Sequence, residues 1–322
     1  MATINQDEIL ASIKLLVCMA KADGKLLDEE RLGLIQSLES LSLPEGITLD
    51  SLLEENLDPE QIIPQITSET ARESVYQAAY LMAHIDGNCS NEEQKLLDRI
   101  AHQFAGFQPF GTESWLENLE NRAMQSSLAH QMKKIADREQ RSIEVDRVIM
   151  DYCFFNAVFG AFPFPGVAIL LDLLIYWNQL SLVQTIGERW GYTAQNEDLK
   201  KALFGSLAVT GARIAFSNFT KLIPIVGMVA GATTAYATTW AIGKVANQYY
   251  AEGGKMDQFK LQEAFKLAKQ EGESLYKENA DSIATRRREL EPKLEEITAE
   301  LKAGKITPEQ YQEEVQKLTI GS

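Results

Sequence analysis

Acidic side chains recur at equivalent positions of two turns, and they are the residues best suited to chemistry in this sequence. Asp23 and Asp86 each precede a glycine, and Glu30 and Glu93 follow them seven residues later. If the two turns pair, the four carboxylates repel one another by about 1 kcal/mol per pair at contact in water. A divalent cation or a basic partner would relieve that repulsion. We therefore take these four acids as a candidate metal or docking site.

A second interpretation of the same acids is structural. An Asp-Gly step is typical of a turn, and a glutamate in the first turn of a helix is stabilised by the helix dipole. In that case the two turns stay apart, and each acid serves only its own helix terminus. The sequence leaves both interpretations open.

The sequence lacks the common motifs of catalytic sites. The sequence contains no GxxxxGK[ST] phosphate loop, no GxSxG elbow, no HExxH pair and no CxxC pair. We therefore expect no enzymatic activity and no cofactor, with a divalent cation as the one exception, and the scattered cysteines favour a reduced cytosolic setting. The histidines and cysteines are His84, His102, His130, Cys18, Cys89 and Cys153.

The acidic turns belong to an internal repeat with an offset of 63 residues. LLVCMAKADGKLLDEERLGL, which starts at Leu15, aligns without gaps with AAYLMAHIDGNCSNEEQKLL, which starts at Ala78. Gly24 and Gly87 can adopt the left-handed conformation that ends a helix, and Asn91 can cap the helix that follows the second turn. Each copy is predicted to be a helix, a tight turn and a helix.

The segment before the first turn has the pattern of an amphipathic helix. Residues 6–22 carry apolar side chains at helical spacing. Asn5 and Glu8 have the spacing of a capping box at its start. The doubled A-x-x-D-G-x-x-x-x-E-E turn resembles the TerB-like family of tellurite-resistance and co-chaperone-associated helical domains, over residues 6–106. The resemblance implies a metal or partner site at Asp23, Glu30, Asp86 and Glu93.

Charge is distributed unevenly along the chain. Residues 1–124 hold 22 Asp and Glu against 8 Lys and Arg, whereas the remainder holds 24 against 23. An acidic surface repels phosphate backbones, so we expect no nucleic-acid binding. A polar helix is predicted over residues 127–150.

Two apolar stretches form the middle of the chain. Residues 152–186 contain one charge, Asp172, and residues 203–250 contain three cations and no acid. Each stretch is interrupted by a Pro-x-x-Gly segment, so each is predicted to fold as a helix hairpin, and together they would make a four-helix unit. The stretches are borderline in length and polarity for spanning a membrane. The predicted turn residues are Pro163, Pro165, Gly166, Pro224 and Gly227.

The single acid among the apolar residues needs an explanation. Asp172 is either a hydrogen-bonded core carboxylate or the partner of a cation, because a buried charge requires compensation. The candidate partners are Arg213, Lys221 and Lys244.

Residues 148–253 carry, in order, PFPG, ERWG, IPIVG and AGATTAY. This order resembles the hydrophobic domain of YcjF-like inner-membrane proteins, a domain that also follows Era-type GTPase domains in bacterial chains. The resemblance implies association with a membrane or service to a separate GTPase.

The tail after residue 254 is charged and helix-forming, and it ends in LEEITAELKAGKITPEQYQEEVQKL. Gly304 is predicted to end one helix, and Thr307, Pro308 and Gln310 to start another as N-cap, N1 and N3. This segment resembles the short SHOCT-type motif, which implies oligomerisation or tethering.

The sequence thus predicts an all-α protein with three parts. These are an acidic TerB-like helical domain (1–125), a linker helix with two hydrophobic hairpins (126–253) and a charged helical tail (254–322). We expect a non-catalytic scaffold at the cytosolic face of a membrane that presents its acidic head to protein partners and forms homo-oligomers. The alternatives are a soluble oligomeric partner of a GTPase or stress complex, and a divalent-metal or tellurite-stress sensor.

Overall fold

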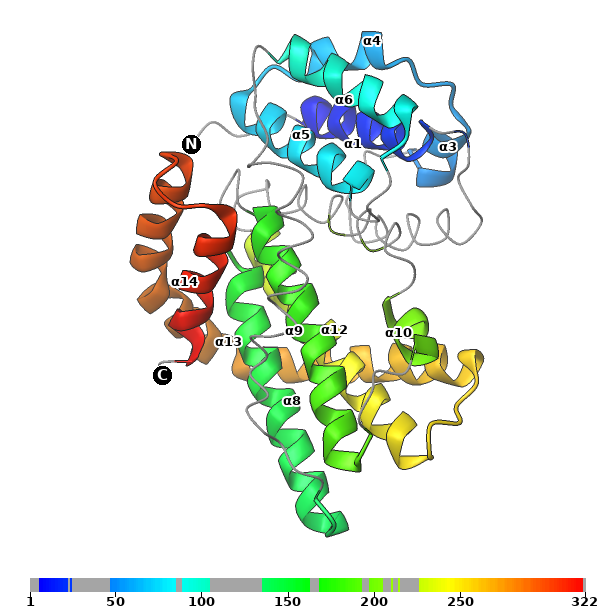
Figure 1. The fold of residues 1–322 in the computed structure, drawn as a ribbon, viewed down its shortest axis with the longest axis vertical. Helices are drawn as coiled ribbons and strands as arrows, with labels where there is room; N and C mark the ends of the chain where they lie inside the picture. The colour runs from blue at the N-terminus through cyan, green and yellow to red at the C-terminus, as the bar shows by residue number, and fades with distance from the viewer. Residues whose placement is uncertain are drawn as a thin grey trace. The chain divides into compact units, whose positions relative to one another are not determined.

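The computed structural model confirms the all-α fold class, because every regular element among the residues it describes is a helix (Figure 1). The chain divides into two compact units, which are treated separately below. The N-terminal unit comprises residues 1–117, 163–169 and 206–228, and the bundle unit comprises residues 118–162, 170–205 and 229–322. The described residues are 6–22, 24, 47–84, 89–104, 135–162, 168–192, 197–204, 210, 214 and 226–320.

The N-terminal unit is built around its first helix. Helix α1 contacts α3, α4, η1 and α5, and α5 contacts α6 (Figure 1). Leu15, Leu16 and Val17 of α1 are fully buried. The helices are α1 (Gln6–Ala20), α3 (Leu49–Glu54), α4 (Pro59–Ile62), η1 (Ile63–Gln65), α5 (Glu69–His84) and α6 (Asn91–Gln103).

The described parts of the internal repeat have the predicted local structure. After α1 the chain turns at Gly24, which has a φ of +70°. In the second copy α5 and α6 are the two helices, but the N-cap of α6 is Ser90 and not Asn91. The Ser90 hydroxyl accepts a hydrogen bond from the Glu93 N–H at 3.2 Å, and a serine caps a helix as well as an asparagine does. Gly87 lies outside the described residues.

The bundle unit contains part of each apolar stretch and the charged tail. Helix α13 contacts α8, α10 and α14, and the boundary predicted near residue 253 stays a prediction. The helices are α8 (Arg138–Gly160), α9 (Ala168–Trp190), α10 (Glu197–Phe204), α12 (Val226–Ala251), α13 (Gln258–Lys302) and α14 (Pro308–Ile320). The first two residues of α9 and the first three of α12 fall in the ranges of the N-terminal unit.

The prediction of one helix over residues 127–150 is wrong at its start and end. Helix α8 begins at Arg138 because Asp137 caps it, accepting a hydrogen bond from the Gln140 N–H at 2.7 Å. It then continues to Gly160, so one helix joins the polar linker to the first apolar stretch. Residues 127–134 lie outside the described residues.

Small residues bring three helices close to α12. A Cβ atom on Gly160 of α8 would lie 2.7 Å from the Gly231 carbonyl oxygen, and one on Gly272 of α13 would lie 2.8 Å from the Ala237 Cα. A Cβ on Gly187 of α9 would meet the ring of Tyr250 at 3.0 Å. Because side chains larger than hydrogen do not fit at these crossings, the glycines set how closely the helices pack.

The second predicted turn differs from the structure at one residue. Gly227 is the second residue of α12 and therefore lies in a helix instead of a turn. Proline blocks a helix that runs into it but can precede a new one directly, so a helix can begin within a Pro-x-x-Gly segment. The other predicted turn residues, Pro163, Pro165, Gly166 and Pro224, lie outside the described residues.

The end of the chain forms the predicted helical hairpin. Gly304, with a φ of +66°, follows α13. Thr307 and Gln310 form the capping box of α14, because the Thr307 N–H donates to Gln310 Oε1 at 2.9 Å and the Gln310 N–H donates to the Thr307 hydroxyl at 3.3 Å. Tyr311 and Val315 of α14 are fully buried.

Among the helices that the structure describes, one, α9, is long and apolar enough to cross a membrane. Its most apolar window has a mean hydropathy of 1.3. However, 94% of that window is buried inside the protein. Core helices of soluble proteins meet the same criterion, so α9 alone is weak evidence for a membrane span.

Candidate functional site

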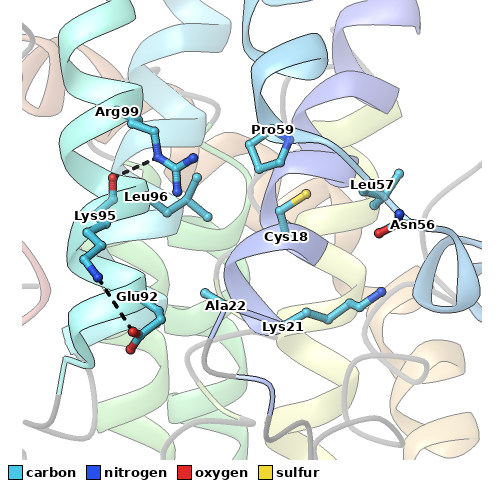
Figure 2. Close-up of a pocket in the computed structure, with 10 residues that line it drawn as sticks. All are labelled: Cys18, Lys21, Ala22, Asn56, Leu57, Pro59, Glu92, Lys95, Leu96 and Arg99. Carbon is cyan, nitrogen blue, oxygen red and sulfur yellow. Dashed lines mark hydrogen bonds and ion pairs between the residues drawn. The ribbon is translucent and has the colours of Figure 1, made fainter.

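A pocket of about 330 Å³ lies in the N-terminal unit between α1, α6 and the segment before α4. Figure 2 shows Cys18 on α1, Lys21 directly after the end of α1, and Glu92, Lys95 and Arg99 along α6. Its lining combines three cations with one acid, in a unit that is otherwise strongly acidic. The lining residues are Cys18, Lys21, Ala22, Asn56, Leu57, Pro59, Glu92, Lys95, Leu96 and Arg99.

Each of these cations already has a partner. The Lys21 ammonium donates hydrogen bonds to the carbonyl oxygens of Leu53 at 2.9 Å and Glu55 at 3.1 Å, so it satisfies the C-terminal end of α3. Lys95 pairs with Glu92 at 3.8 Å (Figure 2). The third cation, Arg99, pairs with Glu60 at 3.5 Å. Two of the three positive charges are therefore paired with carboxylates, and the third, that of Lys21, is held by neutral carbonyl oxygens.

The pocket also contains a thiol, that of Cys18. Its side chain is buried, and burial raises the pKa of the thiol to about 11 against the smaller opposing effect of the Lys21 charge. The thiolate is the nucleophilic form of cysteine, and catalytic cysteines have lowered pKa values. At neutral pH the Cys18 thiol is therefore protonated, which is suited to packing rather than to attack on a substrate.

We expect the Cys18 thiol to react with iodoacetamide on the order of 100-fold more slowly than a solvent-accessible thiol at pH 7.5, because both its burial and its raised pKa oppose thiolate formation. Cys89, which is partly exposed, is the internal control. Peptide mass spectrometry over a time course gives both rates from the same sample. Equal rates at the two residues would contradict the packing role of Cys18.

The acids singled out from the sequence are only partly described. Glu93 Oε2 accepts a hydrogen bond from the Ser90 N–H at 2.8 Å, which completes the capping box of α6, so this carboxylate serves its own helix terminus. Asp23, Glu30 and Asp86 lie outside the described residues. No group of three or more metal-ligating side chains occurs in the part of the chain that the structure describes. The four-carboxylate site stays a prediction.

A different acid links two segments of the N-terminal unit. Oε1 of Glu8 accepts hydrogen bonds from the Thr67 N–H at 2.7 Å, the Thr67 hydroxyl at 2.6 Å and the Ser68 N–H at 2.7 Å. Burial alone would raise the pKa of Glu8, but these hydrogen bonds outweigh it and lower the pKa to about 2. The sequence carries no signal for this contact across 59 residues, and Asn5, the capping-box partner predicted for Glu8, lies outside the described residues.

A buried polar network joins three helices of the bundle unit. Asn156 of α8 donates to the Thr239 hydroxyl of α12 at 3.0 Å, and Asn178 of α9 donates to Asn156 Oδ1 at 3.0 Å. Gln179 of α9 also donates to the Thr239 hydroxyl, at 3.1 Å. Sequence reasoning missed this network, because these residues are scattered singly through apolar stretches.

Asp172 is buried, with 9% of its surface exposed. One of its three candidate partners, Lys244, pairs instead with Asp146 at 3.4 Å. Arg213 and Lys221 lie outside the described residues. The identity of a cationic partner for Asp172 therefore stays a prediction.

Comparison with known proteins supports part of the sequence interpretation. Residues 3–105 match a TerB-like family described as "Protein of unknown function (DUF533)", which confirms the TerB-like resemblance at the N-terminus. The chain is also similar to magnetosome membrane protein 22 of Magnetospirillum gryphiswaldense, with 32% identity over 127 residues. That similarity covers 37% of this chain and 63% of the relative, so the chain spans less than two thirds of the relative's length. No solved structure shows a significant match.

Proposed function

We propose that this protein is a non-catalytic scaffold that associates with the cytosolic face of a membrane and presents its acidic N-terminal unit to protein partners. The observation that carries the membrane part is the similarity to a protein named as a magnetosome membrane protein. The resemblance of residues 148–253 to the YcjF-like hydrophobic domain supports the same interpretation. The charge of residues 1–124, with 22 acids against 8 basic residues, supports recognition of basic partner surfaces.

The burial of α9 supports a peripheral mode of association. A helix that spans a bilayer exposes apolar side chains to lipid, whereas 94% of the apolar window of α9 is covered by protein. Exposing that window would disrupt its contacts with α8 and α12. The protein therefore binds the membrane from one side, through its surface.

The pocket in the N-terminal unit supports the non-catalytic part of the proposal. Its thiol has a raised pKa, and its cations are held by neighbouring oxygens. A reactive nucleophile would need the opposite property, namely a lowered pKa, and burial outweighs the effect of the nearby Lys21 charge at Cys18.

The second candidate function is a soluble, oligomeric partner of a separate GTPase or stress complex. The burial of α9 also supports this candidate, because a covered core helix needs no membrane. The SHOCT-like resemblance of the terminal hairpin supports oligomerisation. The two candidates differ in whether the full chain is found with membranes.

Fractionation of native cells tests the proposal. We expect the full chain in the membrane pellet and its release by an alkaline carbonate wash, because a peripheral protein is held without a spanning helix. A cytosolic enzyme followed in the same fractions is the control for incomplete lysis. Recovery in the detergent-free soluble fraction would favour the second candidate, and release only by detergent would contradict the peripheral mode.

A further inference from the structure

We draw no further inference here: the strongest candidate, the surface patch formed by the exposed side chains of Phe259 and Leu267 on the N-terminal part of α13, lies among equal numbers of lysines and acids over residues 255–273, and nothing in the structure shows what covers it.

Discussion

Thr239→Val is expected to lower the free energy of unfolding of the bundle unit by about 2–4 kcal/mol, because it leaves buried donors without an acceptor. The Thr239 hydroxyl is fully buried and accepts hydrogen bonds from Asn156 and Gln179. It also donates to the Ala235 carbonyl at 2.7 Å. Valine has nearly the same shape, so the loss reports hydrogen bonding and not a cavity.

Urea unfolding of the full chain, followed by tryptophan fluorescence, measures this effect. Trp177, Trp190 and Trp240 all belong to the bundle unit, so the signal reports mainly on that unit. Thr285→Val is the matched control, since the Thr285 hydroxyl makes the same type of bond, to the Asp281 carbonyl at 2.9 Å, on an exposed surface. We expect a change below about 0.5 kcal/mol for the control. Equal changes in the free energy of unfolding for the two substitutions would contradict a contribution of the buried network to stability.

The buried polar network also restricts how α8, α9 and α12 can be aligned along their axes. Asn156 and Gln179 can both reach the Thr239 hydroxyl, and Asn178 can reach Asn156, only when α8, α9 and α12 align as observed, whereas apolar side chains tolerate sliding. The Thr239→Val variant is therefore also expected to unfold less cooperatively. A smaller slope of the free energy of unfolding against urea concentration would reveal this.

Glu8→Gln is expected to destabilise the N-terminal unit by roughly 1.5–3 kcal/mol at pH 7, because an amide replaces a carboxylate that accepts three hydrogen bonds. The pKa of Glu8 is about 2 in the folded protein against a model-peptide value of 4.5. A difference of that size corresponds to about 3 kcal/mol of stability. Since the folded pKa is lowered, this stability is present above pH 4.5 and is lost as the pH falls from 4.5 to 2.

Urea unfolding monitored by circular dichroism between pH 7 and pH 3 measures this dependence, and hydrogen exchange of α1 amides assigns the transition to the N-terminal unit. The difference between the unmodified chain and Glu8→Gln should be constant above pH 5 and shrink at lower pH. Glu69→Gln, which changes an exposed acid in the first turn of α5, is the control and should have a small effect. A difference that stays constant down to pH 3 would exclude the lowered pKa of Glu8.

Several local features followed from the sequence because the contacts that decide them lie within a few residues. The turn at Gly24, the capping box of Thr307 and Gln310 and the predominance of helix were all predicted and are confirmed. Caps and turns depend on hydrogen bonds between residues two to four positions apart, so the residue types and their spacing determine them. The same reasoning missed the cap of α6 by one residue, since both Ser90 and Asn91 are good caps.

Contacts between distant segments were decided only by the tertiary structure. Glu8 meets Thr67 across 59 residues, and Asn156 meets Thr239 across 83. Composition likewise could not distinguish the covered apolar residues of α9 from the exposed Phe259 and Leu267, because hydropathy records what a side chain prefers and not what surrounds it. The sequence by itself therefore determined an all-helical protein with an acidic N-terminal part and an apolar middle. Which carboxylate is held by hydrogen bonds, which polar groups pair in the core and which apolar side chains face solvent depended on how the helices pack.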